Sequence, residues 1–359
     1  MMKAAVCREF GKPLSIEHVN LRAPLPGEIE VKIEACAICH SDIHFIDGAW
    51  DTELPAIYGH EAAGRVVSVG DGVNSYKPGD PVLVTLIRAC GECWNCCDGH
   101  PANCGFASNL PDGPLSAADG TPLLQGLKTA AFAERTVVDP SQIVKFPESV
   151  SMEAAALMAC GVITGVGAAI NTAKVRPGTT VAVIGAGGVG LNAIQGALIA
   201  GAAKIIAVDT RSEKLEAARE FGATHCVLAT EEKPHRQVKA LNGGQGVDYV
   251  MVTVGSTDVY NLAPRYLAYG GKVIIVGMTP SGENSFYQPV AIAATGQAML
   301  GSSMGDTVLR RDVPYLMELY RQGRLKLDEL ITGRYSLENI NDAIAATKSG
   351  LSRRNVILF

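Results

Sequence analysis

Four cysteines within fifteen residues constrain the fold of this chain more than any other feature. Their spacing is C-x2-C-x2-C-x7-C, formed by Cys90, Cys93, Cys96 and Cys104, with Cys97 as a fifth thiol beside them. Four thiolates this close in sequence can complete a tetrahedral shell around one zinc ion, which leaves no position for a substrate. We therefore predict a structural zinc knot, and expect any catalytic metal to use other residues.

Composition narrows the class of protein. The chain has 359 residues and a net charge of −5 without a dense basic run, which favours two domains and argues against nucleic acid or an anionic membrane as partner. The N-terminal segment lacks the apolar core of a secretory signal. The longest apolar stretch, residues 179–208, contains polar residues and glycines, which indicates a strand, a helix and a strand without a membrane span. Ten cysteines without such a signal indicate metal binding in a reducing cytoplasm.

The pattern of apolar runs and turn residues changes near residue 162. Residues 1–161 contain short apolar runs separated by turn residues, such as IEVKIEACAI and AAGRVVSVG, and this pattern predicts a β-rich, barrel-like lobe. Residues 162–301 alternate uninterrupted apolar runs with helical patterns, as in a doubly wound α/β domain with a parallel sheet. Residues 302–359 end in the short strand RNVILF, and we assign this tail to the first lobe.

A glycine-rich turn in the second domain has the pattern G-x-G-x-x-G. It follows a predicted strand and opens a predicted helix, the context in which this pattern binds a dinucleotide. The first glycine permits the tight turn, the second lets a pyrophosphate approach, and the third lets the helix pack closely on the strand. The predicted binding loop consists of Gly185, Ala186, Gly187, Gly188, Val189 and Gly190. The alternative is a glycine-rich turn without a ligand.

Asp209 ends the next predicted strand, 19 residues beyond Gly190. A carboxylate there accepts hydrogen bonds from the ribose hydroxyls of NAD and repels the 2′-phosphate of NADP. Arg211 offers a partner for such a phosphate, so NADP stays the less favoured alternative. Lys214 is either a second ribose ligand or a solvated helix lysine.

Three further segments carry residues of the types that bind zinc: residues 39–44 (CHSDIH), residues 59–61 (GHE) and residues 160–161 (CG). Cys39, His60 and Cys160 would supply S, N and S donors and leave a fourth position free, the arrangement of a catalytic zinc. Taken singly, each residue has a structural alternative: Cys160 as an ordinary buried thiol and His60 as a histidine in a turn. Their combination with a nucleotide loop predicts an open metal site.

Together these motifs resemble those of the zinc-dependent alcohol dehydrogenases of the medium-chain dehydrogenase/reductase superfamily. The resemblance spans nearly the whole chain and rests on CHSD, GHEAAG, the four-cysteine segment, CGVITG, GAGGVG and RRNVILF, in the order and spacing of the family. It implies a GroES-like catalytic domain, formed by residues 1–161 and 302–359, and a Rossmann domain for NAD, formed by residues 162–301. It also implies two zinc ions per chain, one catalytic and one structural.

The resemblance also implies roles for single residues that no spacing or motif in the sequence would indicate. Asp42 would hydrogen-bond the ligand histidine, and Glu61 would lie behind the metal. Ser41 would touch the substrate oxygen, and His44 would be the outer base of a proton relay. His40 would lie near the pyrophosphate, where many relatives have arginine, Thr164 would pack on the nicotinamide, and Arg354 would hold a cofactor phosphate, with Arg353 as its competitor. A substrate slot would be lined by Trp50, Leu86 and Met278, for each of which core packing is an equal alternative.

The implied activity is the reversible oxidation of a primary or secondary alcohol to an aldehyde or ketone, by hydride transfer to NAD in a homodimer or homotetramer. A dehydrogenase for the thiol adduct of formaldehyde or for a polyol is the alternative within the family. A zinc-free quinone reductase is disfavoured by the two ligand sets. A zinc-ribbon binding module is disfavoured because the knot contains Glu92 and Asp98 against only Arg88 and His100. Residues 106–129 form a long segment rich in Pro, Gly and Asp after the knot. We expect an irregular loop that either borders the substrate entrance or is simply mobile, and its sequence indicates no substrate.

Overall fold

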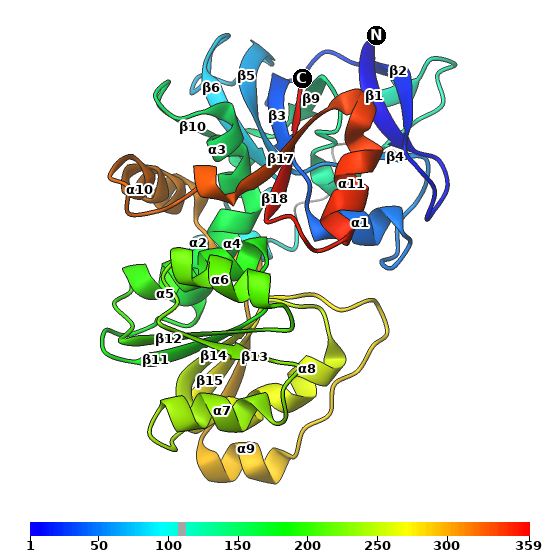
Figure 1. Cartoon of the computed structure of the whole chain (residues 1–359). Coiled ribbons are helices and arrows are strands. Elements are labelled where there is room, and N and C mark those ends of the chain that lie inside the picture. Colours follow the sequence, from blue (N-terminus) through cyan, green and yellow to red (C-terminus); the bar gives the residue numbers. More distant parts are fainter. Residues whose placement is uncertain (107–112) are drawn as a thin grey trace. The chain divides into compact units, whose positions relative to one another are not determined.

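The computed structural model describes residues 1–106 and 113–359, which form two compact units (Figure 1). The first unit contains Met1–Gly161 and Val308–Phe359, and the second contains Val162–Thr307. The second boundary lies six residues later than the predicted 301/302, because residues up to Thr307 are bonded within the second unit. Asn171 Nδ2 donates to Gly305 O at 3.1 Å and Thr172 Oγ1 donates to Asp306 Oδ2 at 2.6 Å.

Two sheets build the first unit. In the described residues, one sheet has five strands in the order β7-β2-β1-β4-β8, and the other has seven, in the order β10-β6-β5-β3-β18-β17 with β9 paired to β3. The strands of this unit are β1 (Met2–Cys7), β2 (Ser15–Leu21), β3 (Ile29–Ala37), β4 (Ala56–Ile57), β5 (Glu61–Val69), β6 (Pro81–Thr85), β7 (Leu115–Ala117), β8 (Leu124–Gln125), β9 (Arg135–Val138), β10 (Ile143–Lys145), β17 (Ile331–Ser336) and β18 (Arg354–Leu358).

Strand β3 shows why this lobe is β-rich. Its sequence IEVKIEACA alternates buried Ile29, Val31 and Ile33 with more exposed charged residues, so one face joins the core and the other faces outward. The alternation ends in the buried residues Cys36 and Ala37, which carry the chain directly to Cys39. The core of the lobe thereby places the first predicted metal ligand.

The C-terminal tail completes the second sheet of this unit. It contains helix α10 (Leu309–Arg321), β17, helix α11 (Ile340–Lys348) and β18. Strand β18 runs antiparallel to β3, with Val356 opposite Ala37 and Leu358 opposite Ala35, and is drawn in red beside the blue β3 in Figure 1. The last strand is therefore an interior strand of the sheet, and it brings Arg354 toward the residues that follow β3.

The remaining helices of the first unit are short. They are the α-helices α1 (His40–Ile46), α2 (Trp94–Cys97) and α3 (Met152–Leu157), the π-helical segment η4 (Met158–Val162), and the 3-10 turns η1 (Pro101–Asn103), η2 (Gly126–Lys128), η3 (Pro140–Gln142), η8 (Asp328–Leu330) and η9 (Leu337–Asn339).

One helical run is long and apolar enough, by length and composition, to cross a membrane. Among the described residues this is Met152–Thr172, with 21 residues and a mean hydropathy of 1.7, and 89% of its most apolar window is buried within the protein. Such burial is typical of a core helix in a folded domain. Two π-helical segments interrupt the run, η4 and η5 (Ala168–Thr172). Single π turns of this kind often occur at functional sites, and Cys160 lies in the first one.

The second unit is built on a six-stranded parallel sheet, numbered here within its described residues. Its order is β13-β12-β11-β14-β15-β16, the 3-2-1-4-5-6 order of the Rossmann fold. The strands are β11 (Thr180–Ile184), β12 (Lys204–Asp209), β13 (His225–Leu228), β14 (Val247–Val252), β15 (Leu267–Ile275) and β16 (Ala298–Gly301). All residues of β11 are buried, as expected for a strand covered on both faces.

Helices alternate with the strands of this sheet in the chain, and the first of them precedes β11. They are α4 (Ile163–Gly167), α5 (Gly188–Ile199), α6 (Ser212–Glu220), α7 (Pro234–Leu241), α8 (Thr257–Leu262) and α9 (Pro289–Thr295), with the 3-10 turns η6 (Ala263–Tyr266) and η7 (Met304–Asp306). The predicted alternation of strands and helices is therefore confirmed, and the parallel sheet confirms the doubly wound fold class.

The prediction of an irregular loop over residues 106–129 is partly wrong. Residues 107–112 lie outside the described residues. Residues 113–129 form β7, β8 and the turn η2, and not an irregular loop: β7 pairs with β2 and β8 pairs with β4. Leu115, Ala117 and Leu123 are buried. The pairing was not visible in the sequence because turn residues separate these few apolar positions.

Candidate active site

The buried cluster in the first unit brings together three distant segments. Ligand atoms of Cys39, His60, Glu61 and Cys160 all lie within 4.8 Å of one another, and all four residues are buried. Cys39 is the N-cap of α1, His60 directly precedes β5, and Cys160 lies in the π-helical η4. The structure thus assembles the S, N and S donors that the sequence predicted as one site.

The carboxylate of Asp42 connects the segment that contains Cys39 with the segment that contains His60. This fully buried carboxylate lies 2.9 Å from His60 Nδ1 through its Oδ1 atom, which also accepts the N–H of Gly59 at 2.9 Å. Its Oδ2 atom accepts the N–H of Cys39 at 3.1 Å. Because Nδ1 is engaged with the carboxylate, the other ring nitrogen of His60 is the one available to a metal.

Two buried polar atoms of the cluster lack a hydrogen-bond partner. Among the described residues, none pairs with Nε2 of His60 or with Oε1 of Glu61. Buried polar atoms are nearly always paired in native proteins, so these two atoms need an explanation. Zn²⁺ accepts two thiolates and one imidazole and keeps a fourth position for substrate. The donor set and the unpaired nitrogen therefore fit a catalytic zinc ion.

The electrostatics of the cluster also favour a cation. A hydrogen bond with the Cys160 thiol lowers the pKa of Cys39 well below its usual value, and the charge of His60 acts in the same direction. Burial alone would lower the pKa of His60, but the negative charges of Asp42 and Cys39 raise it to about 10. The Cys39 shift comes from donors and positive charge that stabilise its thiolate, whereas the His60 shift comes from the negative charges beside it. A bound metal ion would stabilise the thiolates in the same way as that positive charge.

Glu61 and Arg354 form a buried ion pair at the edge of the cluster. Arg354 Nη2 donates to Glu61 Oε2, and the two side chains are 7% and 0% exposed. Burial lowers the pKa of the Arg354 guanidinium. The negative charges of Cys39 and Asp42 raise this pKa, but the effect of burial is larger. Arg353 instead donates from Nη1 to the carbonyl of Glu329 at 3.1 Å. The predicted contact of either arginine with a cofactor phosphate stays a prediction.

The predicted proton relay and substrate residues of the first unit lie on or near α1. Ser41 and His44 are half-buried, and His40 is exposed. The His44 ring stacks on Trp50 with centroids 4.7 Å apart, and Phe45 meets Trp50 edge-on at 5.1 Å. The imidazole of His44 is thus restrained by an aromatic neighbour.

Three other predicted residues lie farther along the chain. Leu86 follows β6 and is half-buried. Thr164 and Met278 belong to the second unit; Thr164 is 9% exposed, with Oγ1 3.8 Å from Met304 Sδ, and Met278 is 60% exposed. Their roles at the nicotinamide and in the substrate slot stay predictions.

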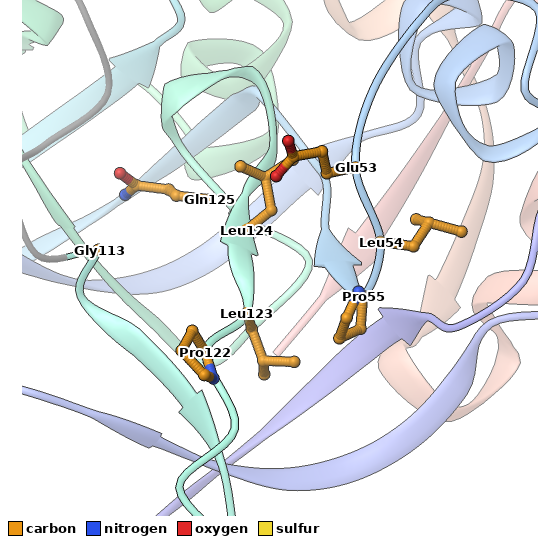
Figure 2. Close-up of a pocket in the computed structure, with 8 residues that line it drawn as sticks. All are labelled: Glu53, Leu54, Pro55, Gly113, Pro122, Leu123, Leu124 and Gln125. Atoms are coloured by element: carbon orange, nitrogen blue, oxygen red, sulfur yellow. The ribbon is translucent and has the colours of Figure 1, made fainter.

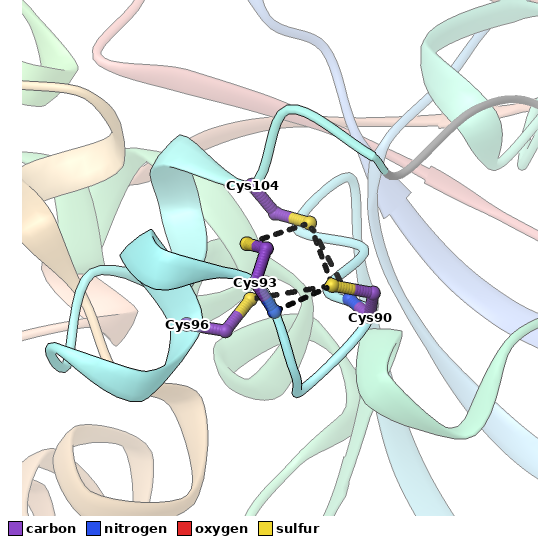
Figure 3. Close-up of side chains that lie close together, drawn as sticks. All are labelled: Cys90, Cys93, Cys96 and Cys104. Carbon is purple, nitrogen blue, oxygen red and sulfur yellow. Dashed lines mark hydrogen bonds between the residues drawn. The ribbon is translucent and has the colours of Figure 1, made fainter.

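The four-cysteine segment forms a second cluster, in which the sulfurs of Cys90, Cys93, Cys96 and Cys104 converge (Figure 3). Sγ of Cys104 lies 3.6 Å from that of Cys90 and 3.9 Å from that of Cys93, and the Cys90 and Cys96 sulfurs are 4.0 Å apart. A tetrahedron with Zn–S bonds of ~2.3 Å has S···S edges of about 3.8 Å. This geometry fits a complete tetrathiolate shell.

Backbone groups support these sulfurs. The N–H of Cys93 donates to Cys90 Sγ at 3.3 Å, and the N–H of Cys90 donates to Cys104 Sγ at 3.4 Å. Although burial alone would raise it, hydrogen bonds from the backbone of Cys90 and Phe106 lower the pKa of Cys104 to about 6. Cys97 lies outside the group; its thiol points to the carbonyl of Gly91 at 3.9 Å.

In the second unit, the glycine-rich loop connects β11 to α5. Gly185 has a φ of +96°, and a Cβ there would lie 2.5 Å from Val254 Cγ1. A Cβ on Gly190 would lie 1.8 Å from the carbonyl oxygen of Gly185, whereas one on Gly187 would meet nothing within 4 Å. The first and third glycines are therefore required by packing, and the second leaves open space at the start of α5. A helix N-terminus with such an approach fits a phosphate.

Asp209 is tied to this loop at the end of β12. Its carboxylate is 7% exposed and accepts the N–H of Ala186 at 2.7 Å and the N–H of Arg211 at 3.1 Å. Gly188 and Val189 form the first turn of α5, and Lys214 lies half-buried in α6. The fold thus places the predicted ribose-binding carboxylate against the predicted phosphate loop.

A pocket of about 280 Å³ lies elsewhere in the first unit (Figure 2). Its wall is mostly apolar, with Leu54 and Pro55 on one segment and Leu123 and Leu124 on another, and Glu53 adds a carboxylate. The predicted site residues do not line it, so the pocket is separate from the buried metal cluster.

Comparison with known proteins places the chain in a family. Residues 25–148 match the model of the alcohol dehydrogenase GroES-like domain, and residues 188–322 match the model of the zinc-binding dehydrogenase. A putative alcohol dehydrogenase D of Mycobacterium tuberculosis (strain CDC 1551 / Oshkosh) is 36% identical over 364 residues, which cover 99% of each chain. This chain belongs to the zinc-dependent alcohol dehydrogenase family.

Solved structures of other alcohol dehydrogenases and related enzymes have the same fold. A benzyl alcohol dehydrogenase from Acinetobacter calcoaceticus is 29% identical, with a TM-score of 0.93 over 100% of this chain and 99% of the other. A putative zinc-binding dehydrogenase from Sinorhizobium meliloti 1021, solved with NADP bound, is 28% identical, with a TM-score of 0.84 over the same shares. This zinc-dependent alcohol dehydrogenase homologue is thus an oxidoreductase of the medium-chain superfamily.

Sequence reasoning missed the residues that hold the peptide before His60. The carbonyl of Gly59 accepts the N–H of Ala131 at 2.9 Å and the hydroxyl of Thr129 at 2.6 Å. Thr129 is fully buried and lies 70 residues from Gly59 along the chain. No local motif signals such a contact, because it depends on how two distant strands are paired.

Proposed function

We propose that this alcohol dehydrogenase homologue catalyses the zinc-dependent, NAD-linked and reversible oxidation of a primary or secondary alcohol to an aldehyde or ketone. The observation that carries the proposal is the buried convergence of Cys39, His60 and Cys160 with an unpaired His60 Nε2. Such a donor set leaves a coordination position for the oxygen of a substrate. The catalytic and cofactor residues below are part of the same proposal.

Two bound groups supply the chemistry that side chains lack. Zinc held by Cys39, His60 and Cys160 supplies a Lewis acid for the substrate oxygen, of the strength that lowers the pKa of bound water from ~15.7 to about 7. NAD supplies the hydride acceptor.

The chain itself fixes the ligands and moves the proton. Asp42 holds the His60 ring through Nδ1 at 2.9 Å, which fixes the tautomer and the direction of Nε2. Ser41 Oγ takes up the hydroxyl proton of the alcohol as it releases its own proton, and His44, with its imidazole held against Trp50, passes a proton to solvent. Glu61, paired with Arg354, keeps a carboxylate behind the metal position.

The proposed preference for NAD rests on Asp209. Its carboxylate is anchored by two backbone N–H groups beside the glycine loop, where a 2′-phosphate would meet negative charge. Replacing Asp209 by Asn should keep the packing and remove the charge. We expect the ratio of kcat/KM for NADP over NAD to rise by roughly 10–100-fold, the value of one charge-assisted hydrogen bond gained or lost. An unchanged ratio in steady-state kinetics would contradict the assignment.

Trp50 is the proposed limit on substrate size. Its indole stacks on the His44 ring and meets the Phe45 ring edge-on, so a movement aside for a large group would cost these contacts. Trp50→Ala should raise kcat/KM for bulky alcohols relative to short ones. An equal ratio of kcat/KM for bulky over short alcohols in the two proteins would show that Trp50 does not line the substrate slot.

The decisive experiment is a substrate screen with NAD and NADP over primary, secondary, aromatic and polyol alcohols and the thiol adduct of formaldehyde. The aromatic arm is included because one solved relative is a benzyl alcohol dehydrogenase. Cys160→Ser is the matched control, since any turnover that survives in this variant does not use the proposed metal site. We also propose a cytoplasmic homodimer or homotetramer, which light scattering after gel filtration will test.

A further inference from the structure

Residues 126–131 form a strained turn directly after β8. Leu127, Lys128 and Ala130 have φ values of 52°, 61° and 55°, the left-handed region in which a side chain with a Cβ is unfavourable. Three such residues in one short segment are rare, and none of them is glycine. Strain of this kind persists only where the surroundings hold it, and it concentrates at functional sites.

Buried side chains hold the carbonyl groups of the strained turn. The carbonyl of Lys128 accepts Gln142 Nε2 at 3.0 Å and Arg88 Nη2 at 3.3 Å. The carbonyl of Thr129 accepts the hydroxyl of Thr136 and, at 3.4 Å, Nε2 of Gln125. Leu124 and Gln125 project to opposite sides of β8 and both line the pocket (Figure 2). The Gln125 amide also reaches the carbonyl of Thr129 in the turn.

The strained turn delivers two donors to one acceptor, the carbonyl of Gly59. Thr129 Oγ1 donates to it at 2.6 Å and the N–H of Ala131 donates at 2.9 Å. On the other side of the same residue, the N–H of Gly59 donates to Asp42 Oδ1, the oxygen that also bonds His60 Nδ1. Gly59 is therefore held on both sides: the turn holds its carbonyl, in the peptide that precedes His60, and Asp42 holds its N–H, in the peptide before that.

Gly59 has no room to find another position. Its φ is +93°, and a Cβ there would lie 2.6 Å from the backbone nitrogen of Phe132, the residue that follows the strained turn. A rotation of the peptide between Gly59 and His60 would break the bonds of the Gly59 carbonyl with Thr129 and Ala131. The Ala131 N–H already satisfies one lone pair of the carbonyl, so the Thr129 hydroxyl adds a restraint on direction.

We propose that Thr129 is a positioning residue for the metal site, which aims Nε2 of His60 at the thiols of Cys39 and Cys160 by fixing the Gly59 carbonyl. The inference rests on the proposed function, because it assumes that zinc binds these three residues. It explains why the chain retains a strained turn at a place that no predicted site residue occupies. It also assigns Arg88, Gln125 and Gln142 the task of holding that turn.

The test compares Thr129→Val, which keeps the shape and removes the donor, with Thr129→Ser, which keeps the donor. The readouts are zinc affinity by competition with a chelator, the visible spectrum of the Co²⁺-substituted protein, and thermal unfolding. We expect Thr129→Val to bind catalytic zinc about 10–100-fold more weakly, the range for residues that orient a ligand, and to shift the Co²⁺ bands. Thr129→Ser should stay close to wild type in both readouts.

Thr347→Val is the matched control. Thr347 is also a buried threonine of the first unit, and its hydroxyl donates to the carbonyl of Ala343 at 2.8 Å in α11. This variant should unfold at a lower temperature and leave metal affinity and the Co²⁺ spectrum unchanged. If Thr129→Val does not fold, Thr129→Ala carries the same expectation.

The outcomes separate the inference from the proposed function. Wild-type affinity and a wild-type Co²⁺ spectrum in folded Thr129→Val would overturn the positioning role, as would the same losses in Thr347→Val. If the metal content of wild type and of Cys160→Ser is equal, the proposed zinc site itself is wrong, and the positioning role is overturned with it.

Discussion

The four-cysteine knot and the buried Cys39–His60–Cys160 centre use similar ligands in opposite surroundings. The knot takes all its ligands from one short segment, its residues are partly exposed, and backbone N–H groups of the same segment support the sulfurs. The buried centre takes its ligands from three segments, and its support comes from Asp42 and the Gly59 carbonyl. A local segment can close a complete shell by itself. An open shell needs a surrounding fold that stops the last position from closing.

The largest expected difference between the two clusters appears when each loses one thiol. Cys160→Ser should reduce turnover to background while the circular dichroism spectrum and the unfolding temperature stay near wild type, because the knot and the sheets are unchanged. Cys104→Ser should instead lower the unfolding temperature, because the shell of the knot holds its lobe together. Thermal melts and initial rates on both variants check this. Equal effects of the two variants on stability would break the distinction between an open and a structural site.

A large effect on stability is expected at Gly59. Gly59→Ala combines a φ of +93° with a Cβ placed 2.6 Å from Phe132 N, and we expect a loss of about 2–4 kcal/mol in the free energy of unfolding. Gly72→Ala is the matched control, because its φ is +84° and its Cβ meets nothing within 4 Å. It should lose only about 1–2 kcal/mol. Urea unfolding measures both, and similar losses would mean that the space around Gly59 is not restricted.

A smaller effect is expected from the carboxylate behind the buried centre. Asp42→Asn should weaken catalytic zinc by about 10–100-fold, because the His60 ring loses a charged partner. Asp98→Asn beside the knot should leave the zinc affinity of both sites unchanged. The Asp98 side chain is 61% exposed and, among the described residues, makes no bond that orients a metal ligand. Chelator competition on the two variants decides the matter. An Asp42→Asn protein with wild-type affinity would show that the imidazole needs no orienting partner.

The smallest effect is expected at Cys97. Its thiol lies outside the four converging sulfurs and contacts only the Gly91 carbonyl among its described hydrogen bonds. Cys97→Ser should keep wild-type metal content, melting temperature and rate. Loss of a zinc ion from this variant would instead make Cys97 a ligand of the knot.

The comparison also explains how far the sequence could be interpreted. The knot, the glycine loop and the parallel strands were predictable, because spacing or periodicity within one short segment determines them. Cys39, His60 and Cys160 were found only as a set, with the help of the family resemblance. The Thr129 contact with Gly59 and the ion pair of Arg354 with Glu61 were not predicted, because strand pairing between distant segments creates them.

One segment was predicted incorrectly, and a domain boundary depends on contacts of the same kind. Residues 113–129 pair with β2 and β4, yet their turn residues suggested an irregular loop. The structure groups residues up to Thr307 with the second unit, because Gly305 and Asp306 bond to the helical segment η5, and the domain boundary at residue 301 stays a prediction. Neither contact leaves a signal in composition.

Metal content tests the central claim most directly. Zinc should be measured per chain, by elemental analysis after gel filtration, in wild type and in Cys160→Ser. The two-cluster account predicts about two zinc ions per chain in wild type and about one in the variant, with the remaining ion in the knot. One zinc ion or none in wild type, or equal counts in the two proteins, would contradict it.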